Sequence, residues 1–119
     1  MVVEALSEDE TDRVFRALAD GTRRDIVRRT LVAEVSVSEL AAKYDMSFAA
    51  VQKHVAVLEE AQLVTKHARG RERMVRGNAA RIRQAQRLLD AFERLQLGRI
   101  ERLDALLAAP DDSAVPSAD

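Results

Sequence analysis

Apolar residues in this chain recur every three or four positions, which is the spacing of amphipathic helices. Five stretches follow this spacing, and polar turn sequences such as "ADGT" and "YDMS" separate the early ones. A sixth stretch, "LVTKHARGRERMVRGN", predicts two strands joined by a tight tip at residues 69–71, where Gly70 can adopt a positive φ. The helical stretches lie near residues 14–18, 22–34, 36–44, 48–58 and from about 79 onward. The pattern therefore predicts a mainly α fold with a small β-hairpin.

The fourth predicted helix carries a polar surface that core packing does not account for. Its apolar stripe recurs at i, i+4 and i+7: Val51, Val55 and Leu58. Phe48, Gln52 and Lys53 point away from that stripe, and Ser47 can cap the helix. A short helix, a turn and a second helix with an exposed polar start form a helix-turn-helix, whose second helix enters the major groove of DNA. The basic hairpin that follows is then a wing, so the predicted fold is a winged helix-turn-helix of about five helices plus the wing.

Positive charge is concentrated in one part of the chain. The formal net charge is −1, yet eight positive residues fall between Lys66 and Arg87, against Glu72 alone. This block has a local charge of +7, and acidic residues toward both ends of the chain compensate it. Such a distribution suits a protein that meets a polyanion with one surface and stays soluble through the rest. A solvated arginine-rich loop and helix would have the same composition.

Three stretches of the sequence resemble the ArsR/SmtB family of winged-helix repressors: "FRALADGTRRDIVRRTL", "VSVSELAAKYDMSFAAVQKHVAVLEEAQLV" and "RGRERMVR". The resemblance covers about residues 12–78 in unbroken order, and a long helix follows where the family has one. It implies a homodimeric transcription regulator, usually a repressor that a metal or another signal releases from its operator. Gly21 replaces the family's usual proline, and Gln62 replaces a glycine after the recognition helix. If Gln62 adopts the left-handed conformation there, the missing glycine costs about 1 kcal/mol.

The resemblance and the polar face of the fourth helix together indicate contacts with DNA. Gln52 can bond bidentately to adenine, so sequence preference should rest mainly on this residue. Phe48 can touch a thymine methyl group, or it can pack on the third helix. His54 can lie between the helix and the phosphate backbone, or it can be half-buried in the core. The residues predicted to bind DNA are Ser47, Phe48, Gln52, Lys53, His54, Arg69, Arg71 and Arg73.

The metal sites of the resembled family lack their usual ligands in this sequence. The family's cysteine site aligns with residues 36–40, where Ser36 and Ser38 occupy both ligand positions, and a serine hydroxyl is a poor ligand for soft ions. The family's other common site uses histidines of the last helix, but no histidine follows His67. We therefore expect neither a metal nor a cofactor, and the sequence does not identify an inducer.

An apolar stripe runs along the last predicted helix, with Arg99 as a polar break. This helix is too long for the small winged core, so together with the first helix it can bury its stripe against a second copy of the chain. Packing within the monomer is the alternative. The residues predicted at the dimer interface are Val14, Leu18, Leu88, Leu89, Phe92, Leu95, Leu103 and Leu106. Residues 1–109 then form a winged helix-turn-helix domain with N- and C-terminal dimerisation helices, and residues 110–119 form a disordered tail.

Other classes of protein find little support in the sequence. The chain shows no signal peptide, no apolar run of the roughly 20 residues that span a membrane, and no cysteine, so we expect a cytoplasmic protein. It has no glycine-rich phosphate loop and no recognisable catalytic grouping, so we do not expect an enzyme. The sequence predicts a homodimeric DNA-binding repressor that recognises an inverted-repeat operator. The alternative is a winged helix for protein–protein interaction, in which the wing arginines bind an acidic partner.

Overall fold

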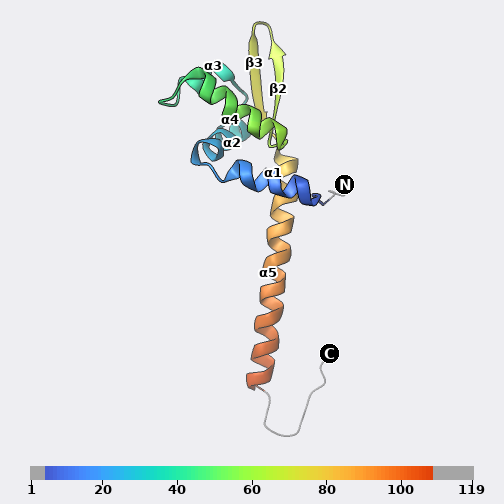
Figure 1. Cartoon of the computed structure of the whole chain (residues 1–119). Coiled ribbons are helices and arrows are strands. Elements are labelled where there is room, and N and C mark those ends of the chain that lie inside the picture. The colour runs from blue at the N-terminus through green and yellow to red at the C-terminus, as the bar shows by residue number, and fades with distance from the viewer. Residues whose placement is uncertain (1–4, 109–119) are drawn as a thin grey trace. The chain divides into compact units, whose positions relative to one another are not determined.

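The computed structural model describes residues 5–108, and the tail predicted at residues 110–119 lies outside this range. The described chain contains five helices and a small antiparallel sheet, which confirms the predicted fold class (Figure 1). It divides into two compact units, one ending at Gln86 and the other beginning at Arg87. The elements are α1 (Glu8–Leu18), α2 (Gly21–Val32), β1 (Val35–Ser36), α3 (Val37–Ala41), α4 (Phe48–Glu60), β2 (Val64–Arg69), β3 (Glu72–Gly77) and α5 (Ala79–Ala108).

Side-chain caps determine where the first four helices begin, because each cap satisfies a backbone N–H that has no partner within the helix. The predicted capping box is present at α3: Ser36 Oγ accepts from the Glu39 N–H at 3.0 Å, and the Glu39 carboxylate accepts from the Ser36 N–H at 3.1 Å. α3 ends at Ala41, earlier than the predicted stretch to residue 44, and Tyr44 lies in the predicted "YDMS" turn. The capping residues are Ser7 for α1, Asp20 for α2, Ser36 for α3 and Ser47 for α4.

The wing belongs to a three-stranded antiparallel sheet in the order β1-β3-β2. Arg69 lies opposite Glu72, so the tip of the hairpin contains two residues. Gly70 has a φ of 63°, as predicted, and a positive φ at the first tip residue is typical of a type II′ turn. The sequence pattern did not predict β1, because two residues are too few to show the alternation of a strand.

One hydrophobic core holds the first unit together, with α2 and α4 packed on the sheet and α1 packed across both helices. Val14 of α1 is fully buried in this core, at 0% exposure. It has no surface to lose against a second copy, so it is a core residue and not the dimer contact predicted from the sequence. Leu18 packs against the same core but is only half-buried. The largest fully buried apolar side chains are Ile26, Leu40, Leu58, Leu63, Val14, Val51, Val55, Val64 and Val75.

Arg81, in the first turn of α5, is buried at 6% exposure. Its Nε donates to the backbone oxygen of Ala61 at 3.1 Å, and its Nη2 lies 3.3 Å from a carboxylate oxygen of Glu10. A buried guanidinium is costly unless it is paired and hydrogen-bonded, and these contacts supply both conditions. Arg81 thus ties the start of α5 to α1 and to the end of α4, and it is not available to a ligand.

A Schellman motif ends α4 with a residue that is poorly suited to it. The Leu63 N–H bonds to the Leu58 oxygen at 2.9 Å, and the Gln62 N–H bonds to the Glu59 oxygen at 2.9 Å. Gln62 takes the left-handed conformation with a φ of 62°, and among the described residues no other non-glycine residue has a positive φ. The side chain therefore carries the steric cost that glycine avoids.

The substitution Gln62→Gly should raise the free energy of unfolding by about 0.5–1 kcal/mol, because it removes the Cβ clash at the left-handed position. Urea denaturation of both proteins measures this difference. Gln62→Ala is the matched control, since it shortens the side chain but keeps the Cβ. A gain of the same size in Gln62→Ala would show that the cost does not lie in the backbone conformation.

Candidate nucleic-acid interface

α4 separates a buried face from an exposed one, as predicted for a recognition helix. Val51, Val55 and Leu58 are at most 1% exposed, whereas Gln52 and Lys53 are exposed. Ser47 caps the helix by accepting the Ala50 N–H at 3.1 Å, so its hydroxyl lies at the exposed start of α4. Phe48, in the first turn, is 47% exposed. The start of α4 thus offers an aromatic ring, an amide and an ammonium group to a ligand.

A hydrogen bond fastens the turn between α3 and α4 to α2. The Tyr44 hydroxyl donates to the Asp25 carboxylate at 2.5 Å, and the Arg29 guanidinium lies 5.9 Å from the centre of the Tyr44 ring. Burial, together with the neighbouring Asp25, raises the pKa of Tyr44 to about 12. The hydrogen bond from Tyr44, reinforced by Arg29, lowers the pKa of Asp25. This network orients the helix-turn-helix without contributing to its exposed face.

His54 does not share the exposed face of Gln52 and Lys53. Its ring is half-buried, and its Nδ1 lies 3.2 Å from Nη1 of Arg23. Arg23 also donates from Nε to the backbone oxygen of Ala17 at 2.7 Å. His54 therefore packs at the corner between α1 and α2. This environment supports the half-buried alternative and gives no support to the predicted DNA contact.

Strand alternation divides the wing into two faces with different partners. Directly paired residues of an antiparallel hairpin point to the same side of the sheet. The register pairs Lys66 with Val75 and Ala68 with Arg73, which places Lys66 and Arg73 on one face. The opposite face carries Thr65, His67, Arg69, Glu72, Met74 and Arg76.

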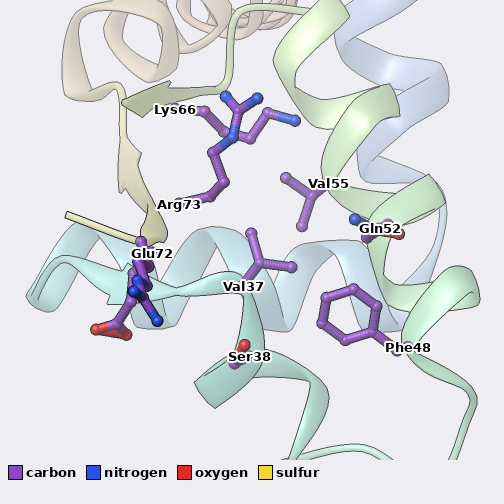
Figure 2. Close-up of a pocket in the computed structure, with 9 residues that line it drawn as sticks. Val37, Ser38, Phe48, Gln52, Val55, Lys66, Glu72 and Arg73 are labelled. Carbon is purple, nitrogen blue, oxygen red and sulfur yellow. The ribbon is translucent and has the colours of Figure 1, made fainter. Parts of the chain in front are cut away.

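The face with Lys66 and Arg73 borders a groove that we call the α4–wing groove. Figure 2 shows these two side chains extending next to each other from the wing, with Val55 of α4 and Val37 of α3 below them and Phe48 farther along. The groove has a volume of about 230 Å³. It thus combines apolar residues with three cations and the acidic Glu72 beside the exposed face of α4. Its lining residues are Val37, Ser38, Phe48, Gln52, Val55, Lys66, Arg71, Glu72 and Arg73.

Within residues 5–108, Arg71 and Arg73 form no ion pair, so both guanidinium groups are free to meet an external anion. Nζ of Lys66 lies 3.4 Å from the Glu59 carboxylate, so these two side chains form an ion pair at a long distance. Arg69, which was predicted to bind DNA, instead pairs with Glu34. Fewer positive side chains of the +7 block are therefore available to an external anion than its composition indicates.

Sequence reasoning did not identify Glu34 as a partner of the wing cations. Its carboxylate accepts from Arg69 and, at 3.0 Å, from Arg76, and it lies 3.1 Å from Nε2 of His67. The side chain of Glu34 is only 14% exposed. A lone glutamate after a helix gives no sequence signal, because its partners lie more than 30 residues away along the chain.

The second unit, from Arg87 onward, exposes an apolar stripe. The stripe follows the three-to-four spacing of one helix face, and Ile100 and Leu107 extend it beyond the predicted residues. Leu88 is half-buried. The exposed predicted residues are Leu89 at 53%, Phe92 at 57%, Leu95 at 71%, Leu103 at 53% and Leu106 at 74%.

No group of three or more metal-ligating side chains occurs among residues 5–108. Ser36, at one of the family's ligand positions, uses its hydroxyl to cap α3. In the same range, no helix is both long and apolar enough to cross a membrane.

The capped helix pair, its exposed second helix and the basic hairpin define the class of winged helix-turn-helix proteins. A family described as a helix-turn-helix domain matches residues 18–67. Rv2034 of Mycobacterium tuberculosis, an HTH-type transcriptional regulator, is 44% identical over 63 residues, which cover 53% of this chain and 59% of Rv2034. The uncharacterized HTH-type transcriptional regulator YuzN of Bacillus subtilis is 39% identical, over 54% of this chain and 77% of YuzN.

Solved structures narrow this class to one family. An ArsR-like transcriptional regulator from Rhodococcus sp. RHA1 superimposes with a TM-score of 0.70 and is 30% identical. The match covers 84% of this chain and 93% of that one. The chain therefore belongs to the ArsR family of winged helix-turn-helix transcriptional regulators.

The substitution Tyr44→Phe should lower the free energy of unfolding by about 1 kcal/mol near pH 7, because it removes the bond to the ionised Asp25. The lowered pKa of Asp25 stabilises the fold above the ordinary value of 3.8, and this stabilisation is lost as the pH falls through the lowered pKa. The difference between wild type and variant should therefore shrink in the acid range. Denaturant titrations at a series of pH values measure it, and a difference that does not change with pH would contradict the role of Asp25.

Proposed function

We propose that this chain is a homodimeric, sequence-specific DNA-binding repressor that recognises an inverted-repeat operator. The observation that carries the proposal is the α4–wing groove, which is lined both by the exposed Gln52 and by Arg71 and Arg73, which have no ion pair within the described residues. The pairing of a base-reading side chain with phosphate-binding cations is what sequence-specific binding requires. Such a regulator acts in the cytoplasm, without a catalytic step and without the cysteine or histidine metal sites common in its family.

In this proposal, residues in the first turns of α4 contact the bases. Gln52 can donate to N7 and accept from N6 of one adenine in the major groove, a contact that discriminates by about 1–3 kcal/mol. Phe48 is 47% exposed and can pack against a thymine methyl group. Ser47 and Lys53 lie at the edges of this surface and are suited to the sugar–phosphate backbone.

In this proposal, the cations on the wing side of the groove bind the phosphates. Arg73 and Lys66 share the wing face that borders α4, and Arg71 follows Gly70 at the tip. The wing would therefore lie along the backbone next to the helix in the major groove. Arg69 and His54 have protein partners, so we leave them out of the phosphate contacts.

Dimerisation is proposed for the second unit because its exposed stripe needs a cover. Stripes of this extent are uncommon on the surface of a stable monomer. A homodimeric winged helix-turn-helix domain, Mb0332 of Mycobacterium bovis, shares the fold at 22% identity and a TM-score of 0.55. A two-fold dimer would present two α4 helices to half-sites about one helical turn apart, which is the reason for an inverted repeat.

The proposal is tested by fluorescence anisotropy of the protein against tiled duplexes from the region upstream of its own gene. A scrambled duplex is the control, and the titrations run at two salt concentrations without added metal. One tile with an inverted repeat should bind in preference to the scrambled duplex. Equal binding to every tile, with retention of an acidic protein partner, would favour the alternative of a protein-interaction module.

The substitution Gln52→Ala should reduce affinity for the operator duplex by about 5- to 150-fold, corresponding to the loss of one bidentate base contact of about 1–3 kcal/mol. Affinity for the scrambled duplex should stay unchanged. Arg73→Gln should instead weaken both duplexes alike and reduce the salt slope by about 0.9. The two variants in the same anisotropy assay separate base readout from phosphate binding, and equal losses on both duplexes in Gln52→Ala would remove Gln52 from base readout.

The substitution Leu103→Glu should weaken the dimer by at least about tenfold, because it places a charge in the apolar stripe. Leu97→Glu is the matched control, since Leu97 has a similar exposure, 50% against 53%, but lies outside the stripe. Sedimentation or light scattering over a range of protein concentrations measures the change. Loss of the dimer in both variants, or in neither, would contradict an interface on this stripe.

A further inference from the structure

Glu34 binds the cationic side chains on one face of the wing. Glu34 lies in the short connection between the end of α2 and the start of β1, so these two elements set its position. Its carboxylate contacts Arg69 and Arg76 through separate oxygens, and His67 shares the oxygen used by Arg76. With 14% exposure, this carboxylate is better shielded from water than its partners, which are 41–64% exposed. Shielding strengthens the attraction relative to an open surface pair.

The two faces of the wing differ in what their cations can reach. Lys66 and Arg73 border the α4–wing groove, whereas Arg69 and Arg76 lie on the opposite face. If Arg69 and Arg76 were free, they would attract phosphates from a direction in which α4 cannot read bases. Such contacts raise the affinity for every sequence alike, because phosphates carry no sequence information.

We propose that Glu34 is a specificity-determining residue that withholds Arg69 and Arg76 from DNA phosphates and so confines phosphate binding to the face of the wing that borders α4. The role rests on the proposed DNA-binding function. It explains why the wing contains more cations than the groove uses. Glu34 touches no DNA in this scheme and acts through the two arginines.

The expected size of the effect follows from counterion release. Each phosphate contact adds about 0.9 to the slope of log affinity against log salt. Between 50 and 200 mM salt, one additional contact therefore increases the loss of affinity by about 3.5-fold, and two contacts by about 12-fold.

The test compares Glu34→Gln with wild type on a random-sequence duplex at both salt concentrations. The substitution keeps the shape of the side chain and removes its charge. Glu34→Gln should bind the random duplex more tightly at low salt and gain up to about 2 in salt slope, while its preference for the operator duplex decreases. Glu60→Gln is the matched control, because it makes the same charge change at an exposed position of α4 that has no ion pair among the described residues. A Glu34→Gln variant that behaves like Glu60→Gln would overturn the proposal.

The first arm of a second comparison keeps Glu34 in place and does not require Glu34→Gln to fold. Replacing Arg69 and Arg76 by glutamine in the wild-type background should lower the salt slope on the random duplex by clearly less than the same pair lowers it in the Glu34→Gln background, because Glu34 already holds both arginines. The same pair of substitutions in the Glu34→Gln background should reverse the gain. A large loss in the wild-type background would show that these arginines bind phosphate directly, and the proposal would fail.

Retention on heparin separates this inference from the proposed function. Glu34→Gln should elute at higher salt than Glu60→Gln, whether or not the wild type prefers any duplex. If no duplex is preferred but the heparin shift is present, the DNA-binding function fails while the role of Glu34 in withholding cations stands. If one duplex is preferred but the heparin shift is absent, the DNA-binding function stands and the role of Glu34 fails.

Discussion

The burial of one apolar stripe of α4 is the constraint on which the candidate interface depends. A helix turns by about 100° per residue, so seating Val51, Val55 and Leu58 in the core directs Gln52 and Lys53 to solvent. Ser47 fixes the start of this helix, and the Schellman motif around Gln62 fixes its end. Because these side chains share one helix with fixed periodicity, a single packing arrangement positions all of its outward side chains together.

In the wing, the two-residue period of a strand likewise determines which face each side chain occupies. Alternation assigns Lys66 and Arg73 to the groove and Arg69 and Arg76 to the other face, where Glu34 meets them. A block of like charges in the sequence is therefore not equivalent to a binding surface. Arg69 and Arg76 meet an internal carboxylate, Arg81 is buried, and Lys66, Arg71 and Arg73 line the groove.

Short-range features could be predicted well, because the groups involved lie within a few residues of one another. The capping box at Ser36 and Glu39, the cap at Ser47, and the positive φ of Gly70 all depend on local backbone geometry. The exposed face of α4 could also be predicted, since helical periodicity is a local property. The predicted dimer contact of Val14 was wrong, and the predicted DNA contact of His54 lost support. Both outcomes arise because these side chains are placed by contacts between α1, α2 and α4. The strand β1 is too short to be recognised before it pairs with β3.

By itself, the sequence determined the order of the helices and the hairpin, the residues that cap them, the faces they present and the resemblance to one family of regulators. These properties follow from periodicity and from hydrogen bonds that span three or four positions. Only the tertiary structure decided which cations remain free, because Glu34 lies 35 and 42 residues from the arginines it binds. Likewise, Arg81 and Glu10 meet across 71 residues of chain. The availability of a charge depends on its neighbours in space, and these are set only once the chain has folded.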